Sequence, residues 1–460
     1  MRPRVFFSAL LPVLAGSAFL GLSCSEPEAA PAPRPKNVLF ILVDTLRADH
    51  LSAYGYARKT SPALDAFARE SLLFENARSQ ASCTFPSANS LLTSRSPTAF
   101  LGQPQQAMGI PPGIRSIAEI LALRGYRTAA VSASPVVRTT KSRFNPTGGF
   151  GRGFSTFDEA CVWKPAHCVN RRALEILAQK NDRPFFLYLH YMDPHGPYRP
   201  PAEHRKFSRK GVATDKAFIR DGDPNPIGDW LYKGEPDPGV TPAELQHLID
   251  LYDDEIVSFD LRFGEFMASL RKAGALDDTI VVLTSDHGEE FLEHGHVKHC
   301  RTLFDSSIRI PYVLRIPGVP ARAVTAPVQN LDLVPTLLDY LGMDATGLQL
   351  EGRSLRPVIE KKEKVGDLRQ FASQGPLRSA ADGRYKLIHD LAAGTWSLYD
   401  LKADPGEKVD ALARERRSFH RLRQSLTVWI DRTEGAGSES ESVRKGKEAE
   451  NKLRSLGYIE

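Results

Sequence analysis

Short hydrophobic runs alternate along the chain with segments in which hydrophobic residues recur every three or four positions. The first run, VLFILV at Val38–Val43, is hydrophobic at every position. Such a strand is typical of a parallel sheet that helices cover on both faces. Further runs of strand length lie at Arg127–Ser132, Phe185–Leu189, Ile280–Thr284 and Tyr312–Ile316.

The segments between these strands have the spacing of helices that are buried on one side. They lie at Ser116–Arg124, Asn170–Gln179, Ala243–Ala273 and, further on, Leu333–Leu341. Alternation of strands and helices predicts a layered α/β fold with a mainly parallel sheet. Residues 199–241 are polar and rich in Pro, Gly and Asp, and we expect them to form a long surface loop that shapes a pocket.

The pattern changes in the last quarter of the chain. Tyr385–His389 and Trp396–Asp400 have the form of strands in a small antiparallel sheet, and a helical pattern follows to about Ile430. We therefore expect a main α/β domain at 37–365, a small α+β subdomain at 366–433 and a charged tail at 434–460.

The N-terminus has the features of an export signal. Arg2 and Arg4 precede an apolar run from Val5 to Leu22, and LGLSC, which ends at Cys24, resembles a bacterial lipoprotein box. We expect a signal peptide at 1–23, a Pro/Ala-rich tether at 24–36, and a lipid on Cys24 that anchors the exported protein to the cell envelope. Ordinary signal-peptide cleavage and an uncleaved anchor are the alternatives.

The charge balance and the cysteine content limit which partners, crosslinks and metal sites the chain can have. The 60 Lys and Arg nearly balance 55 Asp and Glu, and no basic stripe indicates a nucleic-acid partner. Four cysteines remain after Cys24, an even number that favours pairing in an oxidising compartment. Cys161 and Cys168 make the easiest pair, while a Cys83–Cys300 pair is a conjecture. Their spacing does not predict a zinc site.

Three predicted strands are followed by ionisable residues. They are Asp44 after the first strand, then His190, Asp193 and His195, and finally Asp286 and His287. Ligands of open α/β sheets bind at the carboxyl ends of strands. One such carboxylate could be structural, but three groups at one edge favour a site. Asp44, Asp286 and His287 suit a single divalent cation. Gly288 is expected to give the turn its backbone freedom.

The stretch SCTFPSANSLLTSR places Thr84 at the expected start of a helix. Backbone N–H groups and the helix dipole favour an anion at such a position. The alternative is that Thr84 only caps the helix.

Together these residues resemble the sulfatases and their alkaline-phosphatase-like relatives. The resemblance covers most of residues 37–405, through segments such as NVLFILVDTLRADHLSAYGY, TFPSANSLLTS, PFFLYLHYMDPHGPY, TIVVLTSDHGEE and RTLFDSSIRIPYVLRIPG. It implies a three-layer sandwich whose catalytic domain is 37–365, and a metal-bound nucleophile that attacks the sulfur or phosphorus of an ester.

The departures from the family pattern concern the nucleophile. Formylglycine sulfatases have Cys or Ser two positions before Pro86, where this chain has Thr84, and Cys83 lies one position too early. Ala88 replaces the Arg of that motif, and Thr45 replaces a second acid beside Asp44. The resemblance therefore implies a subgroup with a threonine nucleophile, and the spacing argues against formylglycine at position 83.

The resemblance also implies the remaining roles. Thr84 attacks, and one divalent ion, Ca, Mn, Mg or Zn, binds Asp44, Thr84, Asp286 and His287. His195 and Arg301 contact the transferred group, and His299 is a second donor or the general acid. Arg47 could compensate charge near the metal.

The predicted function is that of an exported, metal-dependent hydrolase or transferase of sulfate- or phosphate-type esters. A phosphothreonine can be cleaved by water attacking phosphorus, whereas a threonine sulfate cannot collapse to an aldehyde, so phosphoryl or phosphonyl esters fit Thr84 better. The substrate is expected to be a small-molecule, glycan or lipid-headgroup ester. The alternatives are a formylglycine sulfatase using Cys83, and an inactive binding lipoprotein with the same fold.

Overall fold

The computed structural model describes residues 36–100, 109–163, 165–179, 181–361 and 368–434. The expected signal peptide, the lipidation site Cys24 and the tail beyond Glu434 lie outside these residues. Within the described part of the chain, no helix is both long enough and apolar enough to cross a membrane.

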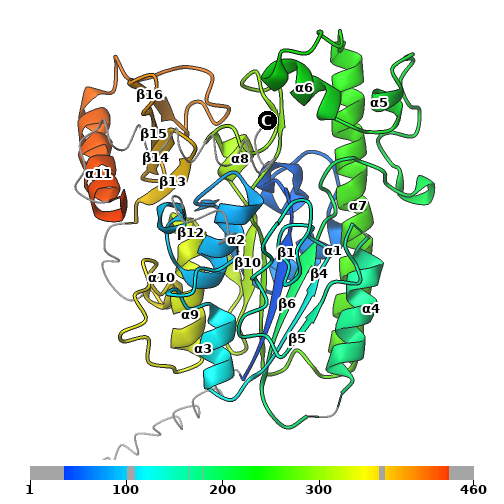
Figure 1. The fold of residues 1–460 in the computed structure, drawn as a ribbon, viewed down its shortest axis with the longest axis vertical. Helices are drawn as coiled ribbons and strands as arrows, with labels where there is room; N and C mark the ends of the chain where they lie inside the picture. The colour runs from blue at the N-terminus through cyan, green and yellow to red at the C-terminus, as the bar shows by residue number, and fades with distance from the viewer. Residues whose placement is uncertain (1–35, 101–108, 164, 180, 362–367, 435–460) are drawn as a thin grey trace, which may run out of the picture. The chain divides into compact units, whose positions relative to one another are not determined.

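An eight-stranded sheet lies at the centre, in the order β11-β2-β10-β7-β1-β6-β4-β5 (Figure 1). Its strands are β1 (Asn37–Val43), β2 (Leu72–Phe74), β4 (Arg127–Ser132), β5 (Thr156–Asp158), β6 (Phe185–Tyr191), β7 (Thr279–Ser285), β10 (Tyr312–Arg315) and β11 (Arg322–Val324). Only β10 runs antiparallel to its two neighbours. The expected mainly parallel sheet is confirmed, and the five predicted strands are found within two residues of their expected ends.

Helices cover both faces of this sheet (Figure 1). Val38, Phe40 and Leu42 of β1 pack in one apolar cluster, and the residues between them pack in the other, because side chains alternate along a strand. The first cluster includes side chains from α2 (Thr84–Thr93), α3 (Ile117–Leu123), α9 (Leu333–Tyr340) and α10 (Arg356–Ile359). The second includes α1 (Pro62–Arg69), α4 (Ala166–Leu177) and α7 (Pro242–Lys272). The structure is therefore the expected three-layer α/β sandwich.

The segment 199–241 is more ordered than a loop. It contains α5 (Ala217–Arg220) and α6 (Asn225–Lys233), and the fully buried Ile219 and Ile227 anchor these helices on the core. The high Pro, Gly and Asp content of the segment concealed the two short helices, because it is typical of turns.

A second sheet of four antiparallel strands follows, with α11 (Arg416–Glu434) packed against it. Its strands are β13 (Gln370–Gln374), β14 (Leu377–Ala381), β15 (Tyr385–Asp390) and β16 (Thr395–Asp400). The expected small C-terminal α+β subdomain is thus present. Short pieces complete the fold: β3 (Ala77–Arg78), β8 (Glu290–Phe291), β9 (Val297–Lys298), α8 (Asp305–Ile308) and β12 (Val328–Gln329).

A buried charge cluster joins the C-terminal sheet to β3 and α8. The Lys386 ammonium on β15 lies 2.7 Å from Asp305 and 2.6 Å from Glu407. The Arg78 guanidinium on β3 reaches the other oxygen of Asp305 at 2.6 Å. Because Lys386 is fully buried, its charge depends on these carboxylates for compensation.

Candidate active site

Three adjacent strands end at the candidate site. Val43 of β1 pairs with Tyr191 of β6 and Ser285 of β7, so the residues that follow these strands meet at one edge of the sheet. Asp44 and Asp286 are brought together in this way. His190, which is still within β6, turns its Nε2 to within 3.2 Å of Asp44 Oδ2. Ligand atoms of Asp44, His190 and Asp286 all lie within 4.8 Å of one another.

His287 enters the same cluster from an irregular turn after β7. Its Nε2 lies 3.3 Å from Asp286 Oδ2 and 3.8 Å from Asp44 Oδ1. Its Nδ1 lies 2.9 Å from the Gly288 carbonyl, which fixes Nδ1 as the donor and leaves the Nε2 lone pair directed at the cluster. Gly288 serves close packing and not a left-handed backbone, since an added Cβ would lie 2.0 Å from the Ser306 carbonyl oxygen.

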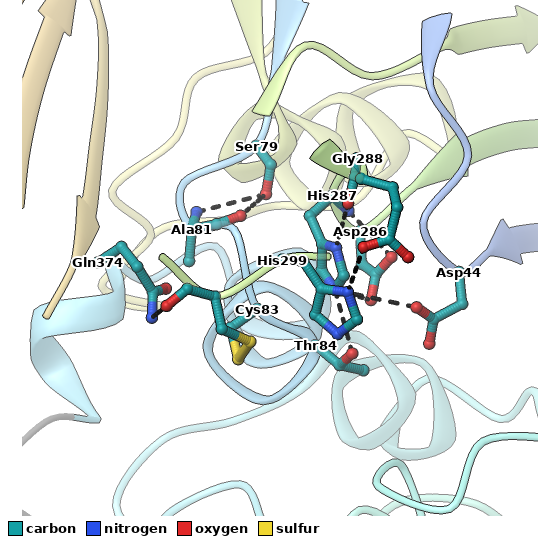
Figure 2. The surroundings of a disulfide bond; sticks show 12 residues. Asp44, Ser79, Ala81, Cys83, Thr84, Asp286, His287, Gly288, His299 and Gln374 are labelled. Carbon is teal, nitrogen blue, oxygen red and sulfur yellow. Dashed lines mark hydrogen bonds and ion pairs between the residues drawn. A yellow bond between two sulfur atoms is a disulfide. The ribbon is translucent and has the colours of Figure 1, made fainter. Parts of the chain in front are cut away.

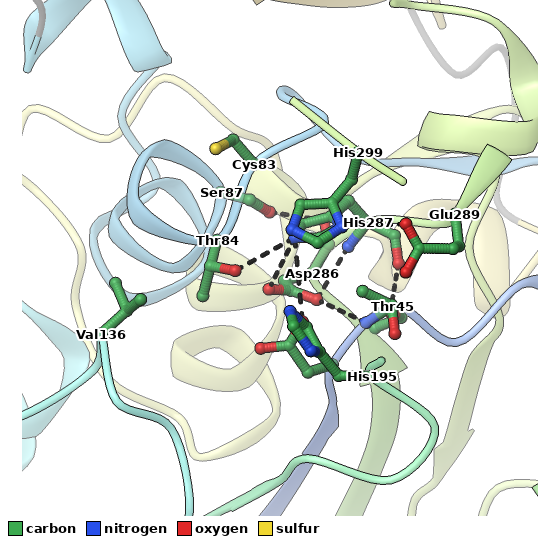
Figure 3. A network of polar contacts seen from close by, with 12 residues as sticks. Thr45, Cys83, Thr84, Ser87, Val136, His195, Asp286, His287, Glu289 and His299 are labelled. Carbon is green, nitrogen blue, oxygen red and sulfur yellow. Dashed lines mark hydrogen bonds and ion pairs between the residues drawn. The ribbon is translucent and has the colours of Figure 1, made fainter. Parts of the chain in front are cut away.

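Thr84 is the first residue of α2, and its side chain points into the cluster (Figure 3). The Thr84 Oγ1 lies 3.1 Å from His287 Nε2. Cys83, and not Thr84, is the N-cap residue, and the cap has no side-chain hydrogen bond. The hydroxyl therefore faces the ionisable cluster and does not cap the helix.

The residues fit a divalent cation. Asp44 Oδ1 and Asp286 Oδ2 are buried and have no hydrogen-bond partner in the structure, which is costly for a carboxylate. Donor atoms about 3–4 Å apart have the spacing of ligands that surround one ion at roughly 2–2.5 Å. Among the described residues, Asp44, His190 and Asp286 form the one group of three or more acidic, His or Cys ligands whose ligand atoms all lie within 4.8 Å of one another.

The charges of the cluster depend on one another. Burial raises the pKa of Asp44, but the hydrogen bond from His190 and the charges of His195 and His287 outweigh it and hold the pKa below its usual value. Burial and the neighbouring Asp44 raise the pKa of Asp286. Burial lowers the pKa of His287, but the charges of Asp286 and Asp44 outweigh it and raise the pKa. The site thus favours positive charge between the two carboxylates.

Two further histidines line the cluster (Figure 3). The His299 ring lies 4.6 Å from that of His287 and 5.1 Å from that of His195. Nδ1 of His299 lies 3.0 Å from Glu289 Oε1, and Nδ1 of His195 lies 2.6 Å from the Gly196 carbonyl oxygen. Each ring therefore keeps its Nε2 available for a ligand.

Arg301 and Arg47 lie in different surroundings. The Arg301 guanidinium stacks over the Tyr232 ring at 4.0 Å and lines a cavity of about 430 Å³ beside Cys300, the residue after His299. Arg47 forms ion pairs with Asp49 and Glu293. Its pairing supports a structural role for Arg47.

Both expected cysteine pairs are present as disulfides. Cys161 joins Cys168, and Cys83 joins Cys300 (Figure 2). Cys83 is therefore not a free thiol beside Thr84.

Of the site residues expected from the sequence, the structure brings together Asp44, Thr84, Asp286 and His287, with His195 and His299 around them. The sequence places His190 among the ionisable residues that follow the predicted strand Phe185–Leu189 but does not assign it as a ligand, whereas the structure includes it in β6 and turns it toward Asp44. The feature that indicates its role is its position across the sheet, because His190 pairs with Leu42, two residues before Asp44.

Family models match nearly the whole described chain. The model of the sulfatases matches residues 36–343, and that of the C-terminal region of N-sulphoglucosamine sulphohydrolase matches residues 292–433. The chain belongs to the sulfatase family. This sulfatase-family protein is an ester hydrolase with the alkaline-phosphatase-like fold.

Individual relatives agree with this assignment. N-sulphoglucosamine sulphohydrolase of Homo sapiens is 28% identical over 401 residues, which are 78% of this chain and 74% of the relative. A multifunctional alkaline phosphatase superfamily protein of Trinickia caryophylli is 26% identical over 470 residues, which are 81% and 90% of the two chains.

Solved structures share the fold at lower identity. The phosphonate monoester hydrolase of Agrobacterium radiobacter matches with a TM-score of 0.68 and 23% identity, over 87% of this chain and 95% of that one. A protein solved with its substrate D-glucosamine-2-N,6-O-disulfate matches with a TM-score of 0.72 and 20% identity, over 88% and 99%.

Proposed function

We propose that this sulfatase-family hydrolase cleaves phosphoryl or phosphonyl esters by attack of Thr84, and sulfate esters less well. The observation that carries the proposal is the position of the Thr84 hydroxyl, 3.1 Å from His287 Nε2 at the start of α2. Thr84 lies where the resemblance to the sulfatases places the nucleophile, and the neighbouring Cys83 is held in a disulfide. A formylglycine mechanism at Cys83 and an inactive binding protein fit this arrangement less well.

The reaction takes two steps. The Thr84 oxygen attacks phosphorus and displaces the alcohol, while its proton passes to a neutral imidazole. His195 suits this role, because burial lowers its pKa and outweighs the charge of Asp44, which raises it. His299, supported by Glu289, gives a proton to the leaving oxygen and later takes one from the attacking water. Attack of that water on phosphorus breaks the bond to Thr84, and His195 returns its proton to the Thr84 oxygen, which restores the hydroxyl.

Preference for phosphorus follows from the second step. A threonine ester of phosphate or phosphonate is cleaved when water attacks phosphorus. The aldehyde route that releases sulfate from a formylglycine hydrate is not open to threonine, because its oxygen-bearing carbon has only one oxygen.

Asp44, Asp286 and His287, with Thr84 and the added His190, would hold one divalent ion, calcium, manganese, magnesium or zinc. Such an ion supplies positive charge that lowers the proton affinity of the Thr84 hydroxyl and offsets charge on the ester oxygens.

The leaving group is assigned to the cavity beside Cys300. Polar side chains from the C-terminal sheet and from the segment after β9 line it, among them Arg301, Gln374, Asp390 and Ser397. Such a lining suits a hydroxyl-rich or charged leaving group, as in a glycan, a small polar metabolite or a lipid headgroup. A human relative that matches most of the chain is named for sulphoglucosamine, which supports a glycan. Arg301 would bind the anionic group from the cavity side.

Residues 1–36 carry the remaining part of the proposal. A basic start, an apolar run and Cys24 support export, followed by lipid anchoring at the bacterial envelope. Incorporation of labelled fatty acid into the full chain, and its loss in Cys24→Ser, would establish this. Release of unmodified protein from cells would contradict it.

Hydrolysis of matched esters tests the chemistry. Purified protein loaded in turn with each of the four metals is given 4-nitrophenyl phosphate, 4-nitrophenyl phenylphosphonate and 4-nitrophenyl sulfate. We expect turnover of a phosphorus ester and a phosphoryl or phosphonyl group on Thr84 after acid quench. Turnover of the sulfate alone, or an aldehyde at position 83, would overturn the proposal.

A further inference from the structure

The Cys83–Cys300 disulfide lies beside Thr84 and His299 (Figure 2). Cys83 directly precedes Thr84, and Cys300 stands between His299 and Arg301. The disulfide therefore connects the proposed nucleophile to the proposed general acid through one peptide bond on each side. The two cysteines are 217 residues apart, and both side chains are buried.

The segment that carries His299 has little regular structure. Residues 299–304 form neither helix nor strand. Two hydrogen bonds accompany the disulfide: the Cys300 N–H donates to the Ser82 carbonyl at 2.7 Å, and Gln374 Nε2 donates to the Cys300 carbonyl at 3.1 Å. The position of this segment is therefore fixed by its contacts with Ser82, Cys83 and the C-terminal sheet.

The backbone at Cys300 is unusual. Its φ angle is +71°, in the left-handed region that residues other than glycine rarely adopt. Such a conformation persists only where surrounding contacts determine it, and it occurs often at functional sites. Because the disulfide holds Cys300 in this conformation, the backbone of the preceding residue, His299, is constrained as well.

We propose that the Cys83–Cys300 disulfide is a positioning crosslink that holds the Thr84 hydroxyl and the His299 imidazole in reactive register. The inference rests on the roles of Thr84 and His299 proposed above. Cys83 and Cys300 are positioning residues, since neither sulfur touches the substrate. Displacement of a reacting group by about 1 Å can cost roughly 100-fold in rate, so a crosslink one residue from each group has a direct effect on turnover.

The other disulfide supplies a matched control. Cys161 and Cys168 close a ring between residues only seven apart, at the start of α4, and neither adjoins Thr84 or His299. Removing this pair also removes one buried disulfide but leaves the link between the two reacting groups in place.

Leaving groups of different basicity separate positioning from folding. We would compare Cys83→Ser/Cys300→Ser with Cys161→Ser/Cys168→Ser on phenylphosphonate esters of 4-nitrophenol and of the more basic phenol. A displaced general acid matters most for the basic leaving group, because that oxygen needs the proton. We expect kcat of the first variant to fall about 10-fold on the nitrophenyl ester and about 100-fold on the phenyl ester, with KM little changed.

Equal losses on both esters, or none, would overturn the crosslink role, because a smaller folded fraction lowers both rates by one factor. Wild type that hydrolyses neither these esters nor 4-nitrophenyl phosphate would overturn the proposed function and this inference with it. If the wild type is active and Cys83→Ser/Cys300→Ser is equally active, only the crosslink role is contradicted and the proposed function stands.

Should the variant fail to fold, the Cys161→Ser/Cys168→Ser protein allows a reversible version. A phosphine reduces its remaining Cys83–Cys300 bond, alkylation with mass analysis counts the thiols, and reoxidation restores the bond. We expect the phenyl-ester rate to fall on reduction and return on reoxidation. Full activity with both thiols free would overturn the inference.

Discussion

Glu289 Oε1 lies 3.0 Å from Nδ1 of His299, at the edge of the cluster that contains Asp44 and Asp286. Burial raises the pKa of Glu289, but the charge and hydrogen bond of His299 outweigh it and keep the pKa below its usual value. Glu289 therefore stays ionised and orients the ring, with Nε2 available to a substrate. This relationship gives the first of five predictions.

Glu289→Gln should lower kcat by about 10- to 100-fold while KM changes little, since a neutral amide stabilises protonated His299 less well than a carboxylate does. The loss should be larger for phenyl than for 4-nitrophenyl esters, as measured by steady-state kinetics on both. An unchanged kcat on the phenyl ester would show that His299 does not act as the acid.

Thr84→Ala should be folded and should lose at least about 1,000-fold in kcat, because the nucleophilic oxygen is gone. Stability should change little, since Thr84 is not the cap of α2. Thr84→Ser keeps the oxygen and serves as the control. Comparable turnover by Thr84→Ala and wild type, in assays with matched circular dichroism, would remove Thr84 from the mechanism.

Asp286→Ala should abolish metal binding and activity together, because it removes an anionic oxygen from the centre of the cluster. Metal content by elemental analysis checks this directly. The exposed Asp277→Ala is the control and should keep both properties. Full metal occupancy in Asp286→Ala would exclude Asp286 as a ligand.

Glu255 should make stability depend on pH. Burial, followed by the charge of Asp193, raises the pKa of Glu255 to about 8, and burial raises that of Asp193 to about 6. The folded state therefore binds protons that the unfolded state releases above its ordinary carboxyl pKa, and stability falls as pH rises from about 5 to about 8. The Arg199 N–H and the charge of Arg205 oppose this shift only in part.

Glu255→Gln keeps the oxygen that accepts from the Arg199 N–H and removes the titration. Between pH 5 and pH 8 the variant should gain about 1–3 kcal/mol in unfolding free energy relative to wild type. Urea unfolding at several pH values measures this difference. Parallel pH profiles for the two proteins would assign the dependence to other groups.

Lys386→Met should destabilise the fold by about 3–5 kcal/mol, because it removes the ammonium that compensates the buried Glu407 and leaves Asp305 with Arg78 alone. Arg384→Ala, two residues earlier, breaks an exposed ion pair with Asp400 and should cost about 1 kcal/mol or less. Chemical unfolding of both variants provides the comparison. Equal costs would mean that the Lys386 cluster is not held out of water.

Several elements could be predicted because their residues carry strong local signals. β1 and β7 are continuous hydrophobic runs, and α7 shows helical spacing over many turns with Thr241 and Glu244 forming a capping box. Strands of three residues, such as β2 and β11, are too short for any periodicity to register. Their place in the sheet depends on pairing with distant segments.

The residues of the candidate site also fall into those that local patterns predict and those that depend on distant segments. Asp44, Asp286 and His287 could be predicted because each follows a strand, and Thr84 because a helix pattern follows it. His190 required knowledge of which strands are neighbours, since its role depends on Asp44 across the sheet. The surroundings of Arg301 depend on how β13 to β16 pack beside α6 and residues 300–304, which local patterns do not encode.

The buried cluster of Arg78, Asp305, Lys386 and Glu407 has a consequence for exchanging parts between relatives. The sulfatase model ends at residue 343 and the C-terminal model begins at residue 292, so the two overlap across β10 and α8. A chimera cut between the sheets, near residue 365, would separate Arg78 and Asp305 from Lys386 and Glu407. Chimeras of this chain with a relative should therefore fold when all four charged residues are present, and fail to fold when only two of the four are present.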